Sequence, residues 1–311
     1  MLTSTCLGGN LELLYYLVLC GLTLEDAWIF GCFQNLIRRQ DIKSEMIEAL
    51  LLQINDPNFH FDGVSFLHLI CFRACPRSTR YLLDRGADRN ALDGVALLVA
   101  SYVGQLDVVR MLIEYKVGEK IPISKVSDAL LLSCECGHVE VAAYLIERGA
   151  DVNVYTELGV SPLAYAVSDG RADIVELLVK TNSLAHTNDR NGLSLLLIAC
   201  QNGHEAIVKV LLDHAADPNV VDGQGFGCLY RACTKYSIMQ VLLEYGADPN
   251  LRSRRSEAPF LRVDLASIGG YHSCECVASM LDYGANVNLA YARTGDTALM
   301  WAASNGHIDL V

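Results

Sequence analysis

One short segment that opens with glycine recurs along this 311-residue chain at a constant spacing. The segments GQLDVV, GHVEVA, GRADIV and GHEAIV begin at Gly104, Gly137, Gly170 and Gly203, and each lies 33 residues after the one before. Gly306 begins a further copy, GHIDLV. A period of this length is typical of a chain built from small units that cannot bury their apolar faces alone and therefore stack on one another.

A second landmark follows twelve residues after these junction glycines, at the point where a helix is predicted to end. The landmarks along the chain are Gly21, Ile54, Gly86, Lys116, Gly149, Asn182, Ala215, Gly246 and Gly284. Eight steps join the first to the last and cover 263 residues, close to 33 per step. ADVN, ADPN and ANVN follow four of them, and aspartate and asparagine at such places favour a tight turn.

The residues between these landmarks predict two helices per unit. Ser161 followed by Pro162 supplies a capping side chain and a first-turn residue that needs no amide hydrogen. Ser194 and Thr297 can cap helices in the same way. The second helix of a unit has one apolar stripe, formed by Val141, Ala142, Leu145 and Ile146, with Glu140 and Glu147 facing away. Gly149 then offers a left-handed stop.

The period and the turn motifs together match the sequence signature of ankyrin repeats, and the chain resembles that family over nearly its whole length. Pieces of the family's helix-start signature survive as SFLHLIC at 65, SPLAYAV at 161, SLLLIAC at 194 and TALMWAA at 297. The resemblance implies an all-α ankyrin-repeat solenoid of stacked helix-turn-helix units with short β-type fingers.

We expect a single ankyrin-repeat array over residues 1–311. Its parts are a partial first repeat at 1–21, a degenerate repeat at 22–58, repeats at 59–294 with an insertion near 251–273, and a truncated last repeat at 295–311. The degenerate part keeps the spacing but lacks the finger and the capping signature, so it is either a worn repeat or a helical cap. The unit between Gly246 and Gly284 has 38 residues, and insertions in arrays map to loops, often on the binding face.

Composition argues against several classes of partner. The formal net charge is −12 and the sequence pI is about 5.1, so the field of the protein repels phosphate backbones and anionic lipid headgroups. We therefore expect no nucleic acid and no membrane as a partner. Twelve cysteines would suit disulfides in a secreted protein, but the N-terminus does not resemble a signal peptide, which favours reduced thiols. The expected location is cytoplasmic, with a nuclear location as the alternative.

The motifs that resemble catalytic or cofactor sites are all incomplete. GQGFG at 223–227 contains a fragment of a phosphate-binding loop, but it follows ADPN at the place of a finger, which favours a turn. GHEAIVK at 203 lacks the second histidine of a zinc protease, and GVSPL at 159 lacks the second glycine of a nucleophile elbow. We expect a protein that is not an enzyme, with no cofactor and no small-molecule substrate.

Two clusters combine histidine with cysteine. They are His68, Cys71 and Cys75, and His272, Cys274 and Cys276. Each offers three zinc ligands, whereas a closed structural site needs four, and the spacings match no standard zinc motif. Buried thiols and a capping histidine are the favoured alternative, so we predict no metal site.

Asn153 is a candidate for hydroxylation, as an implication of the family resemblance. The asparaginyl hydroxylases that act on ankyrin repeats favour a leucine eight positions before an asparagine that follows an acidic and an aliphatic residue. Leu145, Asp151 and Val152 meet this pattern. The alternative is an asparagine that serves only the structure of the turn.

The resemblance also implies a binding surface, because ankyrin proteins usually hold their partner along the finger tips and the exposed ends of the inner helices. The residues at these places are Tyr102, Val103, Glu135, Tyr155, Ser168, Asp169, Arg190, Gln201, Asn202, Lys235, Arg252, Arg254, Arg255, Ser304 and Asn305. Aromatic and arginine side chains are the usual sources of interface energy. The RSRR run at 252–255 either docks an acidic or phosphorylated segment or is a solvated inserted loop.

The predicted function is that of a non-catalytic scaffold or interaction module that binds another protein. The alternative is a substrate-recognition or targeting arm of a larger protein, such as a ubiquitin ligase adaptor or a signalling protein, whose effector domain is missing from this chain. An effector domain after the array would favour the alternative.

Overall fold

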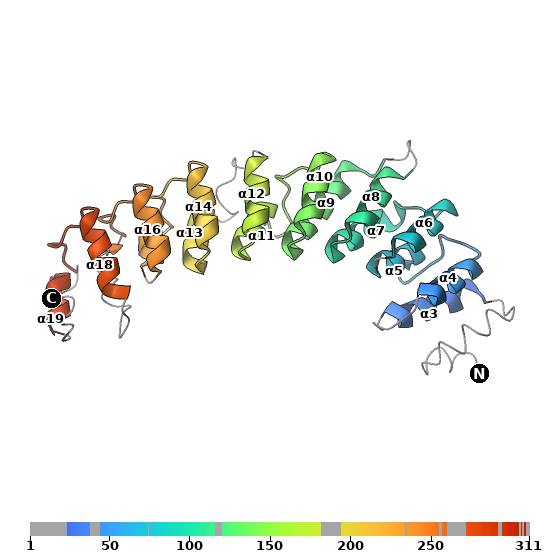
Figure 1. Cartoon of the computed structure of the whole chain (residues 1–311), viewed down its shortest axis with the longest axis horizontal. Coiled ribbons are helices and arrows are strands. Elements are labelled where there is room, and N and C mark those ends of the chain that lie inside the picture. Colours follow the sequence, from blue (N-terminus) through green and yellow to red (C-terminus); the bar gives the residue numbers. More distant parts are fainter. Residues whose placement is uncertain are drawn as a thin grey trace. The chain divides into compact units, whose positions relative to one another are not determined.

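The computed structural model describes residues 24–37, 44–73, 75–115, 120–181, 194–233, 235–254, 257–259, 272–291, 294–304, 306 and 308. The chain divides into two compact units at the boundary between Asp151 and Val152. Within each unit, helix pairs stack on one another (Figure 1). None of the helices in the described part of the chain has both the length and the apolar character needed to cross a membrane.

The first unit is built from two rows of helices. Its described helices are α3 (Asp26–Ile37), α4 (Ser44–Gln53), α5 (Phe66–Phe72), α6 (Pro76–Asp84), α7 (Ala91–Val103), α8 (Leu106–Glu114), α9 (Ile123–Cys136) and α10 (Val139–Glu147). The inner helices α5, α7 and α9 pack in sequence, and so do the outer helices α6, α8 and α10. Because α3 packs on α5 and α4 on α6, the stretch expected to be degenerate continues both rows.

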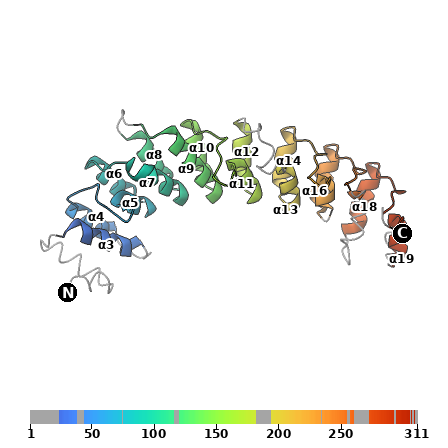
Figure 2. The ribbon, with the colours of Figure 1, turned by 180° about the vertical axis from the view of Figure 1, so that it is seen from behind.

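The second unit repeats this arrangement. Its described helices are α11 (Pro162–Ser168), α12 (Ala172–Lys180), α13 (Leu195–Asn202), α14 (Glu205–Asp213), α15 (Cys228–Ala232), α16 (Tyr236–Glu244), α18 (His272–Asp282) and α19 (Ala298–Ser304). Here α11, α13 and α15 form the inner row, and α12, α14, α16 and α18 form the outer row. Figure 2 shows the same pairs from behind. The predicted all-α repeat solenoid is confirmed.

The helix starts predicted from the sequence are confirmed by hydrogen bonds. The hydroxyl of Ser161 accepts a bond from the amide of Ala164 at 3.1 Å, and Ser194 caps its helix in the same way. Thr297 accepts from the amide of Met300 at 3.4 Å. The predicted stripe of α10 is also correct, since Val141, Ala142 and Leu145 are buried, Ile146 is half-buried, and Glu140 and Glu147 are exposed.

The outer helices α6, α10, α14, α16 and α18 end where the backbone turns left-handed. Gly149 has a φ of 89°, and the amides of Gly149 and Ala150 bond back to the carbonyls of Ile146 and Leu145. Glycine suits this place because side chains rarely adopt such a conformation. Ala215 occupies the equivalent position with a φ of 64°, so one helix stop is made without glycine.

Fingers are present in some repeats and missing in others. In the first unit β1 (His60–Phe61) pairs with β2 (Val64–Ser65) in an antiparallel hairpin, and Asp62 and Gly63 turn it with φ values of 51° and 72°. In the second unit the bridges Val221–Gly227 and Ala290–Thr297 close two fingers. By contrast, the start of α7 after Asn90 is a left-handed turn at Leu92, Asp93 and Gly94, and the described residues between α6 and α10 form no β-bridge.

The core lies between the two rows and includes several thiols. The position three residues before a junction glycine holds Ser101, Cys134, Val167 and Cys200, and each is 0% exposed. Burial raises the pKa of the Cys134 thiol to about 12, so it remains protonated and behaves as a small apolar group. Ten cysteines lie in the described part of the chain, and they form no disulfides with one another.

Candidate functional site

The ends of the inner helices repeat one pattern of burial in both units. After the buried position three residues before the junction glycine, the next residue is exposed, and it is Tyr102, Glu135, Ser168 and Gln201 in successive copies. Tyr102 is exposed over 55% of its surface. The buried position keeps a small side chain, whereas the exposed position changes its chemistry from copy to copy. The stack therefore does not dictate which side chain is displayed.

Most of the other predicted interface residues are also at the surface. At the helix ends Asp169, Asn202 and Ser304 are exposed and Val103 is half-buried. On the fingers Tyr155 is exposed over 45% of its surface, and Arg252 and Arg254 are exposed. Arg190, Arg255 and Asn305 lie outside the described residues, so the structure does not place them.

Lys235 was expected at the exposed end of an inner helix, but it lies at the start of an outer helix. It is the N-cap of the outer helix α16, and its ammonium group donates to the carbonyls of Cys200 and Gln201 at 3.0 and 2.6 Å. His138 and His204 occupy the same place before α10 and α14. Their Nε2 atoms lie 2.9 and 3.2 Å from the carbonyl oxygens of Tyr102 and Ser168. In all three cases the next repeat caps the displayed end of an inner helix, so the ammonium group of Lys235 is engaged within the stack.

Asparagines of the turn motifs also join neighbouring repeats. The sequence indicated only their role in turns. The side-chain amides of Asn58, Asn219 and Asn250 donate to the carbonyls of Gly86, Gly246 and Gly284 at 3.0–3.2 Å. Their carbonyl oxygens accept from the amides of Asp88, Asp248 and Asn286 at 2.7–2.8 Å. We call each such pair of bonds an asparagine rung. The asparagine that closes each turn motif was the signal in the sequence.

Asn153 belongs to the same motif, and its side chain is half-buried. The chain that would correspond to the next helix stop, around Asn182, lies outside the described residues. Hydroxylation of Asn153 therefore stays a prediction, as does its structural alternative.

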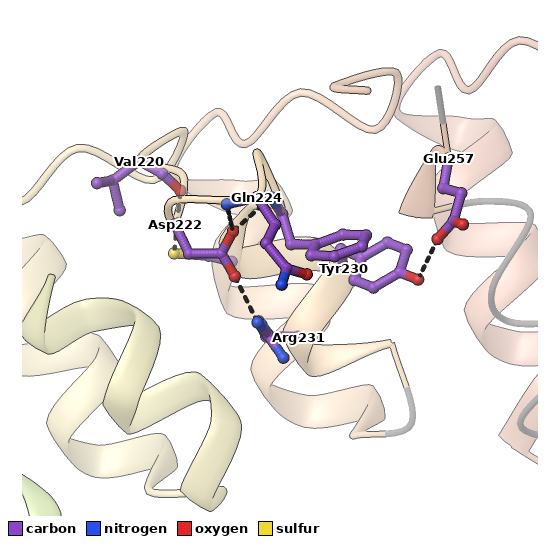
Figure 3. A network of polar contacts seen from close by, with 8 residues as sticks. Val220, Asp222, Gln224, Tyr230, Arg231 and Glu257 are labelled. Carbon is purple, nitrogen blue, oxygen red and sulfur yellow. Dashed lines mark hydrogen bonds and ion pairs between the residues drawn. The ribbon is translucent and has the colours of Figure 1, made fainter. Parts of the chain in front are cut away.

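The finger at 219–227 contains the GQGFG segment, which forms a turn as the sequence favoured. The carboxylate of Asp222 accepts bonds from the backbone amides of Gln224 and Phe226 at 2.8 and 3.0 Å and pairs with Arg231 (Figure 3). Burial would raise the pKa of Asp222, but the bonds from Arg231 and the two amides outweigh it and hold the pKa below its usual value. Asp222 therefore stays ionised and fixes the turn.

A second set of contacts ties this finger to the next one, at 250–257. The amide of Arg254 donates to the carbonyl of Gln224 at 3.0 Å. The hydroxyl of Tyr230 donates to the carboxylate of Glu257 at 2.7 Å, and the ring of Phe226 stacks on Tyr230 with centroids 4.3 Å apart (Figure 3). We call these two segments the paired fingers. The contacts between them form one connected platform, and Arg252 and Arg254 are its exposed arginines.

A groove with a volume of ≈ 240 Å³ lies between α4 and α6 of the first unit. Its lining residues are Glu48, Leu51, Leu52, Arg77, Ser78 and Tyr81. This set contains no histidine, no cysteine and no pair of carboxylates. It therefore offers neither an activated thiol nor a general acid–base pair.

Comparison with protein families gives two matches. A model of ankyrin repeats in three copies matches residues 124–187 and 182–253, and a model of the ankyrin repeat matches residues 294–311. The matched ranges contain the displayed residues Glu135, Ser168 and Gln201 and the arginine at 252. No curated protein matches the chain.

Proposed function

The chain belongs to the ankyrin repeat family, and from this premise we propose that it is a scaffold that binds another protein through its finger tips and inner-helix ends. Ankyrin repeats generally serve as protein–protein interaction modules, and the family is typically non-catalytic. The fold alone does not identify the partner, because function depends on the side chains that a scaffold displays.

The burial pattern at the inner-helix ends is the observation that supports this proposal. Ser101 and Cys134 are fully buried, whereas Tyr102 and Glu135, one residue later, are exposed. The displayed residue can therefore change without disturbing the core. At Tyr102, Ser168 and Gln201 the backbone carbonyl is held by a side chain of the next repeat. Such positions suit recognition, since a rigid scaffold lowers the ordering cost of binding.

We propose a protein as the partner rather than a nucleic acid or a membrane. A net charge of −12 disfavours binding to phosphates and anionic lipids. We also propose the cytoplasm as the location. The support is chemical, because numerous thiols without disulfides, as in the described part of the chain, are typical of a reducing compartment.

Affinity purification with mass spectrometry from native cells tests the proposal. The wild-type chain is compared with a variant that carries Tyr102→Ala, Glu135→Ala, Tyr155→Ala and Gln201→Ala. A matched control carries Tyr245→Ala and Tyr283→Ala, two exposed aromatic residues at the ends of outer helices. Circular dichroism and thermal unfolding verify that all three proteins are folded.

The expected result is that specific partners disappear with the first variant and remain with the control. Partners that remain with both variants would show that binding uses another surface. Partners that disappear only with the control would assign binding to the outer helices and contradict the proposal.

A further inference from the structure

We propose that the paired fingers of the second unit bind an acidic, extended segment of the partner protein through Arg252 and Arg254. This inference deepens the proposed function and rests on it, because it names the chemistry that one part of the surface recognises. The matching ligand is a segment with carboxylates at alternate positions.

The two arginines lie on either side of one buried residue. Arg252 and Arg254 are exposed, whereas Ser253 between them is only 6% exposed. In extended backbone, residues two apart share a face and lie about 6.6 Å apart along the chain, and the exposed–buried–exposed order of residues 252–254 fits that alternation. A second extended chain with acidic residues two apart has the same spacing.

The backbone that carries the arginines is fixed at several points. The amide of Arg254 bonds to the preceding finger, and the amide of Ser253 donates to the carbonyl of Glu257 at 2.9 Å. The hydroxyl of Ser253 accepts from the amide of Glu257 at 3.2 Å. A Cβ atom on Gly225 would lie 2.8 Å from the nitrogen of Arg254, so the two fingers approach as closely as glycine permits. A fixed backbone lowers the entropy lost on binding.

The carboxylates of the paired fingers are already engaged. Asp222 pairs with Arg231, and Glu257 accepts from Tyr230. Asp248, just before the second finger, accepts a bond from the amide of Asn250 at 2.8 Å. Among the described residues, Arg252 and Arg254 form no ion pair. The platform thus presents two cations that are unpaired within the described part of the chain, and the nearby carboxylates of Asp222, Asp248 and Glu257 each already accept a hydrogen bond.

Two physical effects favour a carboxylate ligand here. The guanidinium group binds carboxylates with two parallel hydrogen bonds, which gives strength and direction. The protein as a whole is acidic, but charges beyond about 8 Å are largely screened at physiological ionic strength. Contacts at the arginines therefore count for more than the distant negative charge, and the predicted binding is local and sensitive to salt.

The test is a titration of the full chain into a fluorescein-labelled peptide of alternating glutamate and threonine, followed by fluorescence anisotropy. A peptide of alternating glutamine and threonine is the ligand control. The variants are Arg252→Gln with Arg254→Gln, and Arg252→Lys with Arg254→Lys. The matched control is Arg171→Gln with Lys209→Gln, because both are exposed cations of the second unit and their loss changes the net charge equally.

We expect the glutamine variant to bind the acidic peptide about tenfold more weakly than the wild type. The lysine variant should bind about threefold more weakly, because an ammonium group cannot form the two parallel hydrogen bonds of a planar guanidinium group. The Arg171 and Lys209 control should stay within about twofold of the wild type, and raising the salt should weaken wild-type binding most. Circular dichroism verifies folding of each variant.

Three results would overturn the inference: no binding by the wild type, equal binding of the glutamine peptide, or an equal loss in the matched control. Binding of a phosphothreonine peptide but not the glutamate peptide would also overturn it and assign a phosphorylated segment instead. If one of these results is obtained while partner capture still depends on Tyr102, Glu135, Tyr155 and Gln201, the acidic-peptide inference fails but the proposed function stands. Loss of that dependence contradicts the proposed function whatever the peptide does.

Discussion

Two repeats, one in each unit, secure the ends of their outer helices by different means. In the second unit Asn219 bonds to Gly246 and Asp248 as an asparagine rung. In the first unit the equivalent residue, Asn90, has a buried Oδ1 without a hydrogen-bond partner in the described part of the chain. The neighbouring Arg89 is only 4% exposed, and its guanidinium group donates to the carbonyl of Leu112 at 2.7 Å, so it secures the end of α8 instead.

This difference accompanies the presence or absence of a finger. A finger follows Asn219, whereas α7 follows Asn90 at once, with left-handed backbone at Leu92, Asp93 and Gly94. Lys125 of α9 pairs with Asp93 there. The helix rows continue in both cases, so the stack does not require the finger. The finger is thus free to acquire a binding role, as we propose for the second unit.

Removal of the buried arginine should give the largest effect. Arg89→Ala is expected to lower the free energy of unfolding by about 3 kcal/mol, because the last carbonyls of α8 lose a charged donor and cannot reach water. Urea denaturation of the full chain measures it. Arg85→Ala is the control, since Arg85 is exposed, and a similar loss there would refute the special role of Arg89.

The asparagine rungs predict an asymmetry between equivalent residues. Asn219→Ala should cost about 2 kcal/mol because it removes two cross-repeat hydrogen bonds. Asn90→Ala should cost less than about 0.5 kcal/mol, since Asn90 forms no rung with the described residues and its Oδ1 accepts no hydrogen bond from them. The same urea experiment compares them, and equal losses at both positions would contradict the distinction between these two repeats.

The helix stop at Ala215 offers a stabilising substitution. Ala215→Gly should raise the free energy of unfolding by about 1 kcal/mol, because its φ of 64° is unfavourable for a residue with a side chain. Gly149→Ala in the first unit should have the opposite effect. A Cβ atom there would lie 3.6 Å from Ile123, an ordinary contact, so the loss reports the backbone conformation alone. Thermal unfolding measures both, and a shift of the same sign would refute the account.

The smallest expected effect is a dependence on pH at His68 in the first unit. Burial lowers the pKa of His68 below its usual value of 6.5, and its Nδ1 accepts from the amide of Ser65 at 3.1 Å. The unfolded chain then binds the proton more readily, so stability is full above pH 6.5 and falls as the pH decreases toward the folded pKa. His68→Gln should flatten this part of the stability curve. If the pH dependence of stability is unchanged in His68→Gln, groups other than His68 cause it.

The period and local capping made most of the fold predictable from the sequence. Ser161 and Gly149 act through neighbours in the chain, so their roles could be inferred from local chemistry. The exposure of Tyr102 and Gln201 followed from the register of the repeats. Both the buried and the exposed positions are set by helix geometry, which a fixed period preserves.

The contacts between repeats could not be predicted in the same way. Lys235 follows α15, where TK replaces the glycine–histidine pair of other copies, so the register alone did not show that lysine substitutes for histidine. Arg89 is buried and reaches a carbonyl 23 residues away. Such contacts depend on side-chain direction across two repeats, which a pattern within one repeat does not determine.

That Asn90 forms no rung with the described residues has a mechanical consequence. Where Asn58 and Asn219 each join neighbouring repeats by two hydrogen bonds, a pulling force must break both bonds before the repeats separate. At Asn90 the load falls on the Arg89 contact and on the packing of the helices. Tension along the first unit should therefore open this junction before the one at Asn58, so that the unit extends in steps rather than all at once.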